Sequence, residues 1–127
     1  MSDYRLGVLG GMGPQATNTF YQYIIDHTAA RTDQEHISML IFSDNGVPDR
    51  TAAILSGEEE PVYDRLLYGA KLLEQGGCTA IAVPCNTAHY FLDKVQEQIS
   101  IPILHMVREA CQVLASRGCH YPGVLGT

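Results

Sequence analysis

The chemistry that this sequence can support centres on Cys85, in the stretch TAIAVPCNTAHYF of residues 79–91. Four apolar residues at 80–83 predict a buried strand of a parallel sheet, which the next residue, a proline, ends. Apolar residues then recur at helical spacing, with Asn86 or Thr87 as the expected N-cap. A cysteine between a strand and a helix's amino end meets N–H groups that bind anions and favour the thiolate. Cys85 is therefore a candidate nucleophile or base, although a buried cysteine acting as a small hydrophobe fits the same pattern.

Two histidines lie near Cys85 in the expected fold. His89 follows it by four residues and is a candidate base, a candidate metal ligand shared with the thiol, or a structural histidine on a helix with an apolar face. His105 ends the fourth expected strand, at the same rim. Cys111 falls on an expected core stripe, and Cys78 precedes its strand, so we expect neither of these cysteines to be catalytic.

A polar segment at residues 43–50, SDNGVPDR, ends in Arg50. Its content of Asn, Gly, Pro and Asp is typical of a loop, and it follows a strand's carboxyl end, where open α/β sheets bind their ligands. Because a guanidinium group grips a carboxylate with two hydrogen bonds, Arg50 is a candidate carboxylate clamp. The alternative is a surface arginine paired with Asp49 or Glu58.

Residues 11–16, GMGPQA, fit the G-x-G-x-x-A pattern of a dinucleotide-binding turn. The first acidic residue near the end of the second strand is Asp44, about thirty residues on instead of the ~20 expected for a ribose contact. A tight strand-to-helix turn explains the glycines equally well, and such a turn can also hold a carboxylate through its N–H groups.

The elements that position these residues alternate along the chain. Helical periodicity follows each of four short apolar runs, at residues 6–9, 37–42, 80–83 and 101–104. This alternation implies an α/β fold with a parallel sheet flanked by helices. Residues 123–127, GVLGT, nearly repeat residues 7–11, GVLGG, which predicts the start of an incomplete fifth strand and of a second, similar half.

Composition narrows the function classes. The chain has 127 residues, 46% of them hydrophobic and 17% charged, which suits one globular domain. Its net charge of −6 argues against a nucleic-acid partner or an anionic membrane surface. The amino terminus lacks the pattern of a signal peptide, so we expect a cytoplasmic protein. Four cysteines without a CxxC pair predict free thiols and no structural zinc site.

Three motifs, in this order, carry a resemblance that runs through the whole chain: GGMGP at 10–14, PDRT at 48–51 and PCNTAH at 84–89. The sequence resembles the aspartate/glutamate racemase family and is most similar to its aspartate racemases. The resemblance implies two flavodoxin-like α/β lobes that face a cleft. It also implies no cofactor and two cysteines that remove and return the α-proton of an acidic amino acid from opposite faces.

Carried onto this chain, the resemblance makes Cys85 the first-lobe acid or base. It further implies a carboxylate or amine contact at Asn86 and Thr87, a side-chain carboxylate clamp at Arg50, a cleft wall at Met12 and a carboxylate contact at Thr127. We expect residues 1–120 to form the first lobe and residues 121–127 to begin the second. A homodimer is the expected assembly.

The chain departs from the family pattern in one respect. The family's second cysteine lies in a Gly-Cys-Thr-Glu stretch of the second lobe, whereas residues 77–80 here read Gly-Cys-Thr-Ala and precede a strand. The sequence therefore predicts weak activity, or none, for these 127 residues alone. The alternative function is a non-catalytic module, derived from a racemase half, that binds an acidic amino acid or a partner protein.

Overall fold

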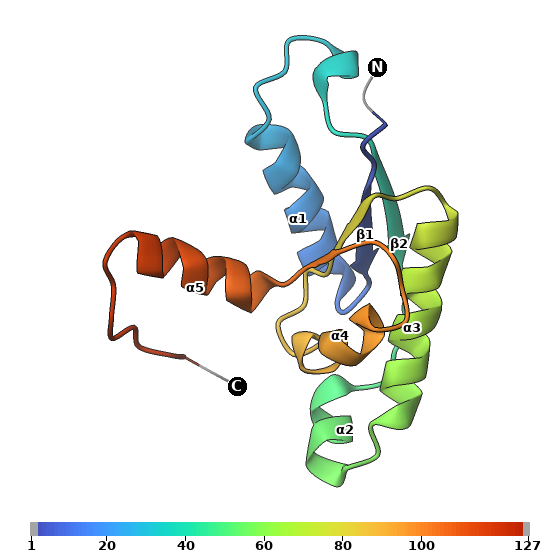
Figure 1. The fold of residues 1–127 in the computed structure, drawn as a ribbon. Coiled ribbons are helices and arrows are strands. Elements are labelled where there is room, and N and C mark those ends of the chain that lie inside the picture. The colour runs from blue at the N-terminus through green and yellow to red at the C-terminus, as the bar shows by residue number, and fades with distance from the viewer. Residues whose placement is uncertain (1–2, 126–127) are drawn as a thin grey trace.

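The computed structural model describes residues 3–125 of the chain. Four strands form one parallel sheet, as the sequence predicts, and their order is β2-β1-β3-β4 (Figure 1). The structure also contains five helices. The elements are β1 (Leu6–Gly10), α1 (Pro14–Asp26), the 3-10 turn η1 (Asp33–Glu35), β2 (Met39–Ser43), α2 (Arg50–Ser56), α3 (Glu60–Gln75), β3 (Ala80–Ala82), α4 (His89–Gln96), β4 (Ile103–Leu104) and α5 (Met106–Ser116).

One face of the sheet carries the main hydrophobic core. Strand side chains alternate between faces, so Leu9 of β1 and Ile81 of β3 point to the side that α3 and α4 cover. The predicted stripe of α3 is confirmed, because all five of its members are buried: Val62, Leu66, Gly69, Ala70 and Leu73. This face holds β3 in place and, with it, the loop that carries Cys85.

The opposite face is covered less completely. Leu6, Val8, Ala80 and Ala82 are buried there in a smaller cluster. The side chains of α1 that reach the cluster are only partly buried. A sheet of this type needs helices along its whole width on both faces, and α1 spans only part of this one. An open groove therefore remains beside α1.

Helix α5 forms where the sequence predicts it but does not join the core. It extends away from the layered body (Figure 1), and each of its residues is exposed. Val107 and Leu114, which belong to the expected core stripe, are 44% and 37% exposed. Cys111 is exposed as well, so its prediction as a core cysteine is wrong. The periodicity predicts the helix and its apolar side correctly, but no element within residues 3–125 covers that side.

The expected fifth strand does not appear in its described part. Residues 123–125 have no strand structure, and Val124 and Leu125 are 89% and 101% exposed. A strand needs a neighbour for its backbone hydrogen bonds, and the segment after α5 lies away from the sheet (Figure 1). The remaining two residues, including Thr127, lie outside the described part of the chain.

Helix α2 is the element that the sequence did not predict. It begins directly after the 43–50 loop, and the Asp49 carboxylate caps it by accepting a hydrogen bond from the Ala52 N–H at 3.0 Å. Gly57, with φ of 80°, ends it in the left-handed conformation. Arg50 is therefore the first residue of a short helix. In the part of the chain that the structure describes, no helix combines the length and apolar character that a membrane span requires.

Candidate active site

The backbone of Cys85 is fixed by two hydrogen bonds. Its N–H donates to the carbonyl oxygen of Val83 at 2.8 Å, which closes a tight turn around Pro84 at the end of β3. Its own carbonyl oxygen lies 2.7 Å from Nδ1 of His89, on the first turn of α4. Cys85 is half-buried, at the carboxyl edge of the sheet.

The turn between Cys85 and α4 differs from the prediction. The N-cap is Ala88, which makes no side-chain capping bond, so the expected cap at Asn86 or Thr87 is wrong. These two residues instead use their carbonyl oxygens, which accept from the N–H groups of His89 and Tyr90 at 3.0 and 3.2 Å. The tight first turn leaves the side chains of Asn86 and Thr87 free for other partners.

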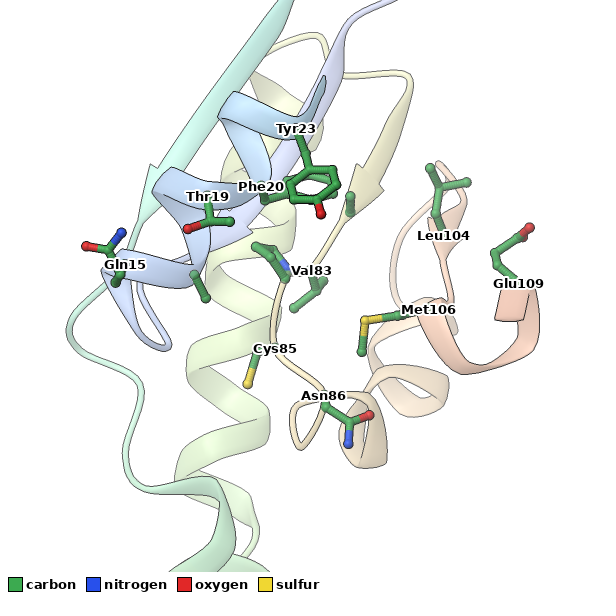
Figure 2. Close-up of a pocket in the computed structure, with 13 residues that line it drawn as sticks. Gln15, Thr19, Phe20, Tyr23, Val83, Cys85, Asn86, Leu104, Met106 and Glu109 are labelled. Carbon is green, nitrogen blue, oxygen red and sulfur yellow. The ribbon is translucent and has the colours of Figure 1, made fainter. Parts of the chain in front are cut away.

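An apolar groove of about 840 Å³ opens beside Cys85, between α1 and the start of α5. Figure 2 shows the rings of Phe20 and Tyr23 at one end and Cys85 with Asn86 at the other. Leu104 and Met106 form the wall opposite α1 (Figure 2). The sequence pattern does not predict this aromatic end.

The structure brings some of the predicted site residues together and separates others. Asn86 borders the groove and also a second hollow of about 410 Å³, which Thr87, His89 and His105 line. Met12 is buried in the main core, against which Cys85 packs. Arg50 lines neither hollow.

Arg50 lacks the partner that a surface arginine would have. Within residues 3–125 it makes no ion pair, so the expected alternative of a bond to Asp49 or Glu58 is wrong. Its Nη1 donates to the Pro48 carbonyl oxygen at 3.2 Å, while its Nε is buried without a hydrogen-bond partner in the described structure. The guanidinium group has further N–H groups that can donate to a carboxylate ligand.

A hydrogen bond to a side chain of α1 holds the glycine-rich turn after β1. The Gly11 N–H donates to the Thr17 hydroxyl oxygen at 2.9 Å. Gly11 has φ of 90°, and a side chain there would meet the backbone of Asp44 at 2.4 Å. Asp44 is 2% exposed and accepts from Arg65 at 2.7 and 2.9 Å. The carboxylate that a ribose contact would require is therefore already bound to Arg65.

The Asp44–Arg65 pair is a structural feature that the sequence alone does not predict. Asp44 also accepts from the Gly46 N–H at 2.8 Å, so its carboxylate shapes the loop that leads to Arg50. The only local signal was an Asp directly after a strand and two residues before Gly, which is typical of an Asx turn. The partner Arg65 lies on α3, and no local pattern identifies it.

The stability of the protein should depend on the charge of Asp44. The Arg65 guanidinium holds the pKa of Asp44 below its usual value. The folded state then binds fewer protons than the unfolded state near pH 4, so the free energy of unfolding should fall as the pH drops through that range. Asp44→Asn should lower the free energy of unfolding at pH 7 by roughly 1–3 kcal/mol and flatten its dependence on acid pH. Urea titrations between pH 2.5 and 7 measure both.

A matched control uses the second ion pair of the described structure, Asp93–Arg108. Both of its side chains are well exposed, at 65% and 61%. Because exposed pairs contribute little, Asp93→Asn should change the free energy of unfolding much less than Asp44→Asn does. Equal effects of the two substitutions would contradict the structural role of Asp44.

The histidines near Cys85 form a pair. The rings of His89 and His105 meet edge to face, with centroids 4.9 Å apart. Burial lowers the pKa of His89, so the ring is neutral at neutral pH. Among residues 3–125, no three His, Cys, Asp or Glu side chains gather into a set of metal ligands. Of the three alternatives for His89, the structure favours a structural histidine that contacts the Cys85 loop.

Comparison with known proteins gives a consistent result for both sequence and fold. The family model described as Asp/Glu/hydantoin racemase matches residues 9–127. The broad specificity amino-acid racemase RacX of Bacillus subtilis (strain 168) is 34% identical over 108 residues, which cover 82% of this chain and 46% of that protein.

Two solved structures extend the similarity to the fold. The Picrophilus torridus aspartate racemase has a TM-score of 0.80 and 33% identity, with 91% of this chain and 48% of that chain covered. An aspartate racemase homologue from Pyrococcus horikoshii OT3 has a TM-score of 0.73 and 25% identity, over 90% of this chain and 50% of that one. The chain thus spans about half the length of the relatives that it matches.

Proposed function

This chain belongs to the Asp/Glu/hydantoin racemase family, and from that premise we propose that it provides one lobe of a cofactor-independent amino-acid racemase. The proposed substrate is an acidic amino acid, aspartate or glutamate. In this proposal, the Cys85 thiol or thiolate transfers the α-proton on one face of the substrate.

The observation that carries the proposal is the position of Cys85. Of the cysteines, Cys78 is buried and lies before β3, and Cys111 and Cys119 are exposed on α5 and after it. Only Cys85 lies at the carboxyl edge of the sheet, next to a groove. In open α/β sheets this edge is where ligands bind.

The other site residues are assigned by the same proposal. Asn86 and Thr87 hold the α-carboxylate and amine of the substrate, and their side chains make no capping bond that would compete. Arg50 binds the side-chain carboxylate, which its lack of an ion pair within residues 3–125 supports. Met12, which is buried in the core against which Cys85 packs, is assigned to the cleft wall, and Thr127 is assigned a carboxylate contact.

One thiol is sufficient to remove the α-proton of the substrate. The Cys85 thiolate accepts the α-proton, which leaves a neutral thiol and a planar carbanion stabilised by groups around its carboxylate. Inversion requires a second acid on the opposite face, whereas return of the proton by the same thiol retains the configuration. We propose that the second acid is a cysteine of a second lobe, as the family resemblance implies.

The assembly is part of the same proposal. The first lobe comprises residues 1–120, and residues 121–127 lead into the second. A homodimer and a cytoplasmic location stay predictions, and the exposed apolar side chains of α5 support the association of this chain with another folded unit.

Iodoacetamide should alkylate Cys85 before the other three cysteines at pH 7. The proposed proton transfer requires a reactive thiol at this position. Cys78 should react last, because burial shields it and raises the pKa of its thiol. Mass spectrometry of tryptic peptides over time gives the order. Earlier modification of the exposed Cys111 or Cys119 would contradict the assignment of Cys85.

A further inference from the structure

His89 contacts Cys85 through one particular nitrogen. Its Nδ1 lies 2.7 Å from the Cys85 carbonyl oxygen. Since a carbonyl oxygen only accepts hydrogen bonds, Nδ1 must carry the proton. The other ring nitrogen, Nε2, is buried and has no hydrogen-bond partner among the described residues. A proton on Nε2 would therefore be an unsatisfied buried donor, which costs free energy.

The surroundings of His89 also disfavour a charged ring. His89 is 6% exposed, and His105 meets it edge to face from the start of α5. The Arg108 guanidinium pairs with Asp93 of α4 at 2.9 and 2.8 Å. The charges of these two groups therefore compensate each other. No carboxylate is recorded in contact with the His89 ring in residues 3–125. The neutral tautomer with the proton on Nδ1 satisfies this site best.

We propose that His89 is a positioning residue for Cys85, a neutral imidazole whose Nδ1–H holds the Cys85 carbonyl, and that it is not the proton acceptor for the thiol. The inference rests on the proposed function, since it names how the reactive cysteine is held. The nitrogen that reaches Cys85 already carries a proton and donates it to the backbone. It therefore has no lone pair with which to accept the thiol proton.

Hydrogen bonds hold both the N–H and the carbonyl group of the Cys85 backbone. The N–H of Cys85 donates to Val83, the residue after β3, and its carbonyl accepts from His89 of α4. With both backbone groups held, the Cα–Cβ bond of Cys85 keeps one direction relative to the groove. Groups held in this way need no reorganisation before reaction.

The first test reads the tautomer directly in the unmodified 127-residue chain. Long-range ¹H–¹⁵N correlation spectra distinguish protonated from unprotonated ring nitrogens, and the missing signals of His89→Asn assign His89. We expect a protonated Nδ1 and an unprotonated Nε2 at pH 7, the opposite of the tautomer that free imidazole side chains prefer. A proton on Nε2, in either the neutral or the charged ring, would overturn the proposal.

The second test links the hydrogen bond to Cys85. In His89→Asn, the amide nitrogen can replace the Nδ1 donor. His89→Phe places an aromatic ring at the same position but has no N–H to donate. We expect the rate of Cys85 alkylation, relative to that of Cys119 in the same molecule, to stay within about twofold in the Asn variant. In the Phe variant it should fall by about three- to fivefold, because one hydrogen bond that holds the Cys85 backbone is lost.

An unchanged ratio in His89→Phe would overturn the positioning role. The two proposals can fail separately. If the tautomer and the two variants behave as expected while Cys111 or Cys119 is alkylated first in the unmodified chain, the reactive role of Cys85 fails and the positioning role of His89 stands.

Discussion

The 127-residue polypeptide should convert L-aspartate to D-aspartate at least about a hundredfold more slowly than a family member of twice its length, because it lacks the second acid. Inversion needs groups on opposite faces of the α-carbon, and Cys85 is the one cysteine of residues 3–125 beside the groove at the carboxyl edge. In D₂O, however, the thiol should exchange its proton with solvent and return deuterium to the same face. L-Aspartate should then gain α-deuterium while it keeps its configuration.

Chiral chromatography and mass spectrometry of the amino acid measure inversion and exchange in one sample. Cys85→Ala is the matched control and should lose the exchange completely. The assay is run at several protein concentrations, because activity that rises with the dimer population would show that two chains complete one site. First-order inversion by a demonstrated monomer would contradict the single-thiol mechanism. Binding without any exchange would favour the non-catalytic alternative.

Arg50→Lys should weaken the binding of aspartate by about tenfold, since an ammonium group cannot reproduce two parallel hydrogen bonds to a carboxylate. Arg50 is half-buried at the start of α2, and its Nε has no hydrogen-bond partner within residues 3–125. Fold stability should change little, because within residues 3–125 the Arg50 side chain makes one hydrogen bond, to Pro48. Isothermal titration calorimetry with aspartate gives the dissociation constant.

Arg117→Lys supplies the control for this measurement. Arg117 is an exposed arginine at the end of α5, so its replacement changes the same chemical group far from the groove. Its affinity for aspartate should equal that of the unmodified chain. Alanine, which lacks the side-chain carboxylate, should bind Arg50→Lys and the unmodified chain equally weakly. Unchanged aspartate affinity in Arg50→Lys would remove Arg50 from the site.

Two helices show how far the sequence determines the fold. The stripes of α3 and α5 have the same helical period, and both helices form. The stripe of α3 is buried because β1 and β2 lie beneath it, whereas that of α5 is exposed. Periodicity reports which side of a helix is apolar, but burial depends on another element that the local sequence does not specify.

The candidate site was predictable in the same partial way. The strand-proline-cysteine order was sufficient to place Cys85 at the carboxyl edge of the sheet. The capping role expected for Asn86 and Thr87 was wrong because α4 begins later, with a tight turn of backbone bonds. The bond from His89 to the Cys85 carbonyl and the ion pair from Arg65 to Asp44 depend on three-dimensional packing, which residue types alone do not reveal.

The central position of β1 also sets the order in which the protein can fold during synthesis. Leu6 pairs with Met39 on one side and with Ala80 on the other. The Arg5 N–H donates to the Thr79 hydroxyl across 74 residues of sequence. One edge of β1 therefore stays unpaired while α1, β2 and α3 emerge from the ribosome, at ~5–20 residues per second. Contacts of such long range slow folding, so β3 is the segment whose arrival fills the second edge of β1 and places the Cys85 loop.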